Sequence, residues 1–113
     1  MSVDLDGRVI RGIVLANTLF RNKWADLPGA VQDESIVVIQ SLVGKSIDQL
    51  PRKLHFHQLT NKPVPSAISP TDKVAAWSLH ITADDRYKAS FTYENGTIYF
   101  RTCGTHQAVD KWP

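Results

Sequence analysis

The sequence predicts an α+β fold in which an N-terminal strand and a two-helix hairpin pack on an antiparallel β-sheet. Three observations support this prediction. Apolar residues recur at helical spacing in the first half of the chain, whereas residues 77–103 alternate apolar and polar side chains as half-buried strands do. An Asn-Gly pair, which suits a tight hairpin turn, separates two of these strands. The length of 113 residues suits one core, so residues 1–113 are expected to form a single domain.

The first half of the chain is expected to supply one strand and two helices. Val9–Leu15 is rich in β-branched residues, which favour a strand. Asn17 is a candidate N-cap for a short helix that ends before Pro28. A second helix is expected from about Pro28 to Val43, with Gly44 just beyond its C-terminus.

The second half is expected to form a long loop followed by three antiparallel strands. Residues 61–73 contain three prolines and little periodicity, which indicates the loop. The strands follow at about residues 77–82, 87–94 and 97–103. The last two are joined by Asn95-Gly96, and this turn predicts the pairs Glu94–Thr97, Phe91–Phe100, Ser90–Arg101 and Lys88–Cys103.

The predicted registers bring basic and histidine side chains to one face of the sheet. The apolar pattern of the preceding hairpin pairs His80 with Lys88. Neighbours on one sheet face lie roughly 5–8 Å apart at Cβ, so His80, Lys88 and Arg101 are expected to cluster. The Asp84-Asp85 turn would lie at the rim of this cluster, and His106 follows the last strand and could fold over it.

Each of these residues also has an ordinary explanation. His80 and Lys88 can be solvated residues of a sheet with one exposed face, and Arg101 can form a surface salt bridge of little energetic value. A metal site built from Cys103-x-x-His106 and His55-x-His57 is a further alternative, but this spacing differs from recognised zinc patterns.

Charge and composition narrow the function classes. The net charge of +2 does not by itself indicate a nucleic-acid-binding protein. Residues 1–44 carry four basic and five acidic residues, whereas residues 45–113 carry nine and six together with all four histidines, so an anionic ligand is expected to bind the second half.

No apolar run approaches the roughly 18 residues of a membrane span, and the start lacks a signal-peptide pattern. A cytoplasmic location is therefore expected, and the single Cys103 agrees with a reducing compartment.

Two segments, FHQLTN and WSLHITADDRYKASFTYENGTIYFRTCGTH, resemble the second half of RelE/ParE-superfamily toxins. The YafQ branch of ribosome-dependent mRNA endonucleases is the most similar in site chemistry. Its motif histidines and aspartate correspond to His57, His80 with Asp84, and His106. Two positions depart from the family pattern: Lys88 stands where many members have arginine, and Asp110 stands where an aromatic residue is common.

The resemblance implies a toxin of a type II toxin–antitoxin system that cleaves mRNA on the ribosome without a metal or other cofactor. It implies a cognate antitoxin as protein partner. It also implies His106 as general acid, Asp84 or His80 as general base, and His57 as a positioning or auxiliary proton-transfer group. The RNA phosphates would be bound by Lys88, Arg101, Arg86 and Lys53. The alternative is a member that cleaves no RNA, either a ParE-like gyrase inhibitor or a degenerate toxin that acts only as a protein-binding module.

Overall fold

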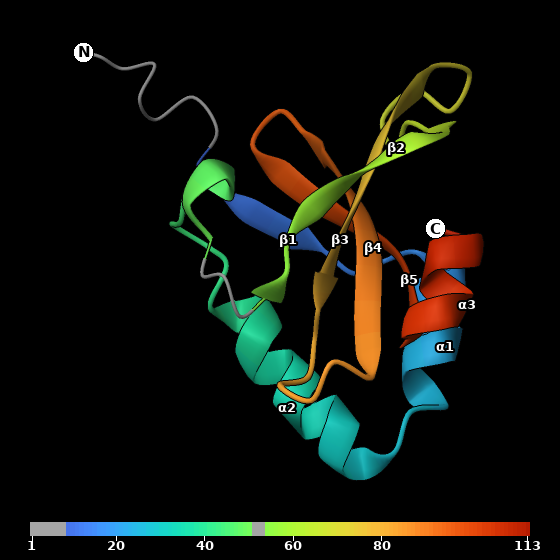
Figure 1. The fold of residues 1–113 in the computed structure, drawn as a ribbon. Coiled ribbons are helices and arrows are strands. Elements are labelled where there is room, and N and C mark those ends of the chain that lie inside the picture. The colour runs from blue at the N-terminus through green and yellow to red at the C-terminus, as the bar shows by residue number, and fades with distance from the viewer. Residues whose placement is uncertain (1–8, 51–53) are drawn as a thin grey trace.

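The chain folds as a mixed α+β structure, seen in a computed structural model that describes residues 9–50 and 54–113 (Figure 1). In chain order its elements are β1 Gly12–Val14, α1 Thr18–Ala25, α2 Gly29–Gln40, a 3₁₀ turn Ile47–Gln49, β2 His57–Pro65, β3 Lys73–His80, β4 Tyr87–Glu94, β5 Thr97–Thr105 and α3 His106–Lys111. The five strands form one sheet in the order β1-β5-β4-β3-β2. The pairs among β2 to β5 are antiparallel, and β1 runs parallel to β5. Within the described ranges, no helix is long and apolar enough to cross a membrane.

The N-terminal strand is shorter than the predicted Val9–Leu15. Its residue Ile10 bonds the segment that follows α2 instead of the sheet: its N–H donates to the Lys45 carbonyl at 2.8 Å, and its carbonyl accepts from the Gly44 N–H at 2.7 Å. Strand β1 is therefore reduced to Gly12–Val14. The first part of the predicted strand instead pairs with the residues that follow α2.

Both predicted helices are present, with one corrected boundary. Asn17 is confirmed as the N-cap of α1, because its side chain accepts a hydrogen bond from the Phe20 N–H at 3.1 Å. Helix α2 ends at Gln40 and not at Val43. The chain then turns through Gly44, whose φ of 89° lies in the left-handed region that glycine adopts without strain.

The predicted loop over residues 61–73 is wrong. Strand β2 continues to Pro65 and β3 begins at Lys73, so only residues 66–72 connect them. Prolines are tolerated in β2 because it is the edge strand of the sheet. On the open side of an edge strand, a missing backbone N–H costs no hydrogen bond to a neighbouring strand. The pairing with β3 also shifts register between Leu59 and Val64.

The last hairpin has the predicted turn but not the whole predicted register. Asn95 and Gly96 have φ values of 52° and 80°, as a type I′ turn requires, and the pairs from Glu94–Thr97 to Phe91–Phe100 are confirmed. Beyond them the register shifts, so the predicted Ser90–Arg101 and Lys88–Cys103 pairs are wrong and the observed pairs are Ser90–Thr102 and Lys88–Gly104. Arg101 is the extra residue of a β-bulge.

One face of the sheet carries the apolar core. Phe20 of α1 and Ile39 of α2 pack with strand residues that include Phe91 and Phe100. The ring centroids of Phe20 and Phe100 lie 5.3 Å apart. The indole N–H of Trp24 donates to the Ser35 hydroxyl at 2.9 Å and thereby joins the two helices.

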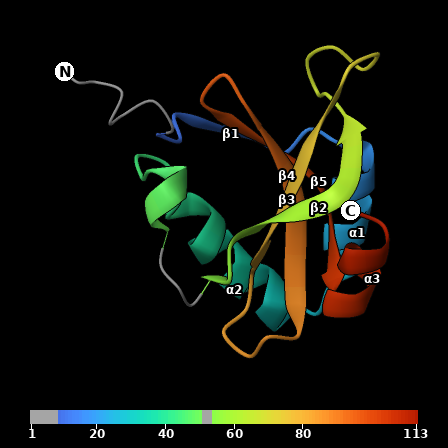
Figure 2. The ribbon, with the colours of Figure 1, turned by 45° about the horizontal axis from the view of Figure 1, so that its top comes forward.

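The opposite face is polar and yet buried. Six of its side chains are at most 5% exposed: Ser78, His80, Lys88, Ser90, Thr92 and Thr102. Helix α3 lies against β4 and β5 (Figure 2), and the Pro113 carbonyl accepts hydrogen bonds from Ser90 and Arg101. The explanation of His80 and Lys88 as solvated residues is therefore wrong.

Glu94 ties the connection between β2 and β3 to this polar face. Its carboxylate accepts hydrogen bonds from the Ser66 hydroxyl, from the Ala67 N–H at 2.9 Å and from the Thr92 hydroxyl at 2.8 Å. Burial acts to raise the pKa of Glu94, but these hydrogen bonds outweigh it and hold the pKa below its ordinary value. The ionised form is therefore the one that the fold stabilises.

We predict that Glu94→Gln lowers the free energy of unfolding at pH 7 by about 1 kcal/mol. Because the folded-state pKa of Glu94 is lowered, its contribution is present above the unfolded-state pKa and is lost as the pH falls through the folded-state value. Urea unfolding at pH 7 and at about pH 3 checks this, with Asp72→Asn in the same connection as control. If Glu94→Gln were still less stable than wild type at the acidic pH, the proposed contribution of the ionised Glu94 carboxylate would be contradicted.

Candidate active site

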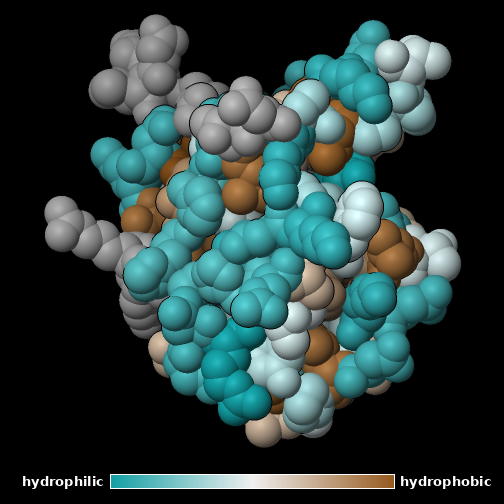
Figure 3. Space-filling view, turned by 45° about the vertical axis from the view of Figure 1, so that its right-hand side comes forward, coloured by the Kyte–Doolittle hydropathy of each residue, from teal (hydrophilic) through white to brown (hydrophobic). Residues whose placement is uncertain are grey.

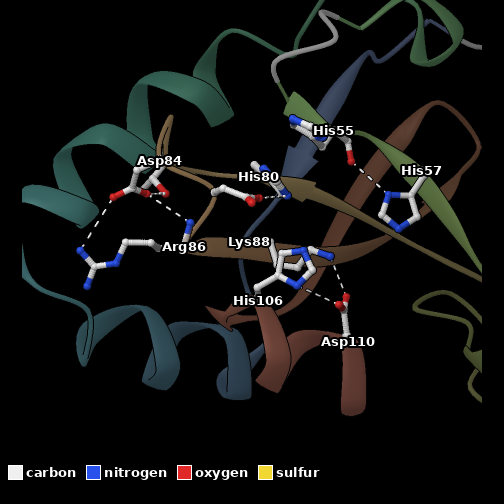
Figure 4. Close-up of polar contacts among 10 residues, drawn as sticks. His55, His57, His80, Asp84, Arg86, Lys88, His106 and Asp110 are labelled. Carbon is white, nitrogen blue, oxygen red and sulfur yellow. Dashed lines mark hydrogen bonds and ion pairs between the residues drawn. The ribbon is translucent and has the colours of Figure 1, made fainter.

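Residues from three elements and one turn meet at one end of the polar face (Figure 4). His80 ends β3 and is paired with Lys88 of β4, as predicted. His106 begins α3, where the Thr105 side chain caps the helix and the His106 N–H donates to the Arg86 carbonyl at 3.1 Å. We call the following five residues the polar cluster: His80, Asp85, Lys88, His106 and Asp110.

Asp110 links the buried lysine to the histidine on α3. Lys88 Nζ donates to Asp110 Oδ1 at 2.6 Å, although the lysine side chain is only 1% exposed. His106 Nδ1 lies 2.9 Å from Asp110 Oδ2, four residues along the same helix. Burial acts to raise the pKa of Asp110, but the hydrogen bond and charge of Lys88, followed by the charges of His106 and His57, lower it below its ordinary value. The carboxylate is therefore ionised and holds Lys88 and His106 at once.

His80 is the buried histidine of the polar cluster. It is 4% exposed, and its Nε2 lies 3.1 Å from Asp85 Oδ1. Its ring stacks on His55 with centroids 4.4 Å apart and meets His106 edge-on at 5.6 Å. Burial lowers the pKa of His80; Asp85 opposes this effect, and the charges of His55, Lys88 and His106 add to it. Neutral imidazole, the form that can accept a proton, is therefore favoured.

Two of the residues that contact His80, His55 and Asp85, have unusual backbone conformations. His55 has a φ of 47° and Asp85 a φ of 70°, in the left-handed region that non-glycine residues seldom adopt. Such conformations persist where surrounding structure holds them, and they are frequent at functional sites. Here they aim an imidazole ring and a carboxylate at the same buried histidine.

Asp85, and not the predicted catalytic residue Asp84, contacts His80. Asp84 instead closes the β3–β4 turn: it accepts from the Thr82 hydroxyl at 2.7 Å and from the Arg86 N–H at 3.2 Å. The hydrogen bond from Thr82, followed by that from Arg86, lowers the pKa of Asp84. Figure 4 shows Asp84 and Arg86 at the turn, away from Asp110. Adjacent aspartates in one turn cannot be told apart by spacing, so no sequence pattern favours Asp85 over Asp84.

Arg101 does not join the polar cluster. Its Nε donates to the Pro113 carbonyl at 3.1 Å. The β-bulge pairs Lys88 with Gly104, which lies three residues further along β5. At about 3.3 Å per residue, this separates Arg101 from that position by roughly 10 Å along the strand.

The remaining predicted residues lie at the rim or outside the described part. The Arg86 side chain is 70% exposed and lies 3.9 Å from Asp84. His57 is exposed on β2, and its Nδ1 lies 3.1 Å from the His55 carbonyl oxygen. Lys53 lies outside the described residues.

Sequence reasoning gave no site role to two features of this region. The Ser78 hydroxyl is buried and has no hydrogen-bond partner among the described residues. A hollow of about 310 Å³ lies beside His80 and is lined also by Glu34, Val38 and Leu54. A hollow beside a buried histidine is a feature of a ligand-binding region.

The metal set considered from the sequence does not form. Cys103 is buried in the core, where its thiol contacts the Phe20 carbonyl at 3.9 Å. Burial raises the pKa of this thiol to about 12, which disfavours the thiolate that binds metals. Among the described residues, the side chains whose ligand atoms lie close enough to share an ion are His80, Asp85 and His106.

Comparisons with protein-family models, with curated proteins and with solved structures gave no match. Function must therefore be inferred from the geometry of the site. Figure 3 shows that the side of the molecule carrying α1 and α3 is mostly hydrophilic, with apolar residues in separate patches.

We predict unequal effects of removing the two partners of the Lys88–Asp110 pair. Asp110→Ala leaves a buried ammonium without its carboxylate and should lower the free energy of unfolding by about 2 kcal/mol, a value reduced by the partial exposure of Asp110. Lys88→Met leaves Asp110 bonded to His106 and should change stability by less than about 1 kcal/mol. Urea unfolding of both variants measures the difference, and equal losses would contradict it.

Proposed function

We propose that this chain is a RelE/ParE-like toxin that cleaves mRNA on the ribosome by metal-independent acid–base catalysis. The order of elements supports the proposal: an N-terminal strand and a helical hairpin precede four antiparallel strands and a short helix that carry the motif residues. The observation that carries it is the placement of His80 and His106, whose ring centroids lie 5.6 Å apart beside a buried ammonium.

In the proposed reaction, a ribose 2′-oxygen attacks the adjacent phosphorus while the bond from phosphorus to the 5′-oxygen breaks. His80 takes the 2′-hydroxyl proton on the ring nitrogen that Asp85 does not engage. His106, held through Nδ1 by Asp110, gives the proton of its other nitrogen to the departing 5′-oxygen. The products are a 2′,3′-cyclic phosphate and a 5′-hydroxyl end.

The carboxylates give each histidine its role. Asp85 stabilises the imidazolium that forms on His80, and Asp110 stabilises the protonated His106 before the transfer. Lys88 supplies positive charge beneath the developing phosphorane, although part of that charge is neutralised by Asp110. No metal or other cofactor enters this scheme.

Exposed groups around the polar cluster are suited to binding the RNA chain. Arg86 at the turn and His57 on β2 present a cation and an imidazole to solvent. The hollow beside His80 offers space for a nucleotide. The Arg101 side chain donates a hydrogen bond to the Pro113 carbonyl, so we assign Arg101 a structural role in the proposal.

The proposed partners are the ribosome with its mRNA in the cytoplasm and a cognate antitoxin. An apolar groove between α1 and α2, lined by Phe20, Trp24, Ile36 and Ile39, suits a protein segment. Ile36 and Val37 are exposed on α2 beside it.

One observation favours the alternative, a ParE-like gyrase inhibitor or a degenerate toxin that only binds protein. Asp110 occupies the position beside Lys88 where an anionic substrate would pair with the ammonium. If the carboxylate stays there when RNA binds, it repels the phosphate. The two classes separate by assay, because a gyrase inhibitor changes DNA supercoiling and leaves mRNA intact.

Induced expression of wild type beside His106→Ala tests the proposed function. We expect growth arrest and cleavage within coding regions for wild type, mapped by primer extension on cellular mRNA, and loss of both for His106→Ala. Removal of a general acid slows a reaction by roughly 10²–10⁴-fold. Arrest without cleavage would favour a replication target, and full cleavage by the folded variant would refute the role of His106.

A matched pair of substitutions tests which aspartate assists His80. Asp85→Asn should slow cleavage of ribosome-bound mRNA by at least tenfold, because the imidazolium loses its carboxylate. Asp84→Asn should have the smaller effect, since asparagine still accepts the Thr82 hydrogen bond. Single-turnover rates measure both, and a larger loss for Asp84→Asn would contradict the role of Asp85 and favour Asp84 as the general base, one of the two candidates that the resemblance implies.

A further inference from the structure

We infer that His80, Asp85 and His106 form a binding site for a divalent transition-metal ion of the Zn²⁺ class. One ligand atom from each of these residues lies within 4.8 Å of the other two. The site is formed from β3, the turn after it and the start of α3, so ion binding would join segments far apart in the sequence. Metal binding itself does not depend on the proposed cleavage of RNA.

Two of the ligand atoms already have the spacing that an ion requires. Ligands on a tetrahedral ion are about 3.3 Å apart when the metal–ligand bonds are about 2.0 Å long. His80 Nε2 and Asp85 Oδ1 are 3.1 Å apart. When His80 is neutral, a proton on Nε2 can lie between this nitrogen and the Asp85 carboxylate. A metal ion bound to Nε2 would take the place of that proton, which would move to the other ring nitrogen of His80.

The third ligand is oriented by its own carboxylate. Asp110 Oδ2 lies 2.9 Å from His106 Nδ1, and a neutral ring with its proton on Nδ1 has a free lone pair on Nε2. Histidine ligands in metal sites usually have this carboxylate partner on the other ring nitrogen, where it fixes the ring and raises its basicity. Asp110 would therefore act as an outer partner of the site.

The three ligand side chains differ in exposure. His80 is buried, whereas the side chains of Asp85 and His106 are 69% and 43% exposed. A rotamer change of His106 would bring its ligand atom, which lies within 4.8 Å of the other two, toward the tetrahedral spacing. The fourth position would face solvent and hold water.

The ligand set indicates which ions bind. Two imidazoles and one carboxylate suit Zn²⁺, Co²⁺ and Ni²⁺, whereas Mg²⁺ prefers oxygen ligands in octahedral geometry. A bound ion would engage the same histidines that the proposed reaction uses. On the basis of the proposed function, Zn²⁺ therefore acts as an inhibitor of cleavage.

Titration of the untagged full chain with Co²⁺, followed by visible absorbance, tests the site. We expect the d–d bands of one tetrahedral or five-coordinate ion, displaced by an equivalent of Zn²⁺ and unaffected by excess Mg²⁺. Absence of the bands, or failure of Zn²⁺ to remove them, would overturn the inference.

Matched variants assign the ligands. Asp85→Asn and His106→Gln should each weaken Co²⁺ binding at least tenfold, whereas Asp84→Asn, one residue away, should bind as wild type does. Asparagine tolerates the positive φ of Asp85, so the first variant should fold. Equal affinity of the Asp84 and Asp85 variants would overturn the site.

Cleavage assays keep this inference separate from the proposed function. Co²⁺ binding by a protein that never cleaves mRNA leaves the metal site standing and refutes the nuclease. Cleavage by a protein that binds no Co²⁺ refutes the metal site alone. If the protein binds Zn²⁺ and excess Zn²⁺ leaves the rate of mRNA cleavage unchanged, the proposed inhibition is refuted.

Discussion

The ion pair of Lys88 with Asp110 is the constraint on which the site depends. A lysine that is 1% exposed needs a counter-charge, because an unpaired ammonium in the protein interior costs several kcal/mol. The carboxylate that supplies it stands on α3 and also bonds His106. One electrostatic requirement of the sheet therefore fixes both the position of the C-terminal helix and the orientation of the histidine that starts it.

The same requirement explains why a polar sheet face is buried. The hydroxyls, His80 and Lys88 would ordinarily face water on a sheet with one apolar side. Here α3 lies against β4 and β5 and supplies Asp110 as the partner of Lys88, and the Pro113 carbonyl accepts a hydrogen bond from Ser90. His80 is thus placed in an environment of reduced polarity, where proton transfer and charge effects are strong.

The fold could be predicted from the sequence to the extent that local rules decide it. The Asn95-Gly96 turn set the first hairpin pairs, and the apolar alternation set the His80–Lys88 pair. The bulge at Arg101 could not be predicted because alternation alone does not show an inserted residue. The choice of Asp85 over Asp84 depended on a left-handed backbone angle, and the role of Asp110 depended on a helix docking across the sheet. Both are tertiary effects.

The central claim is that His80 and His106 act together as base and acid on one phosphodiester. A double-mutant cycle on single-turnover cleavage of ribosome-bound mRNA tests it most directly, with wild type, His80→Ala, His106→Ala and the double variant. Residues that act as a unit show strongly non-additive losses, so the double variant should be little slower than the slower single variant. Losses that multiply, or the absence of cleavage by wild type, would contradict the account.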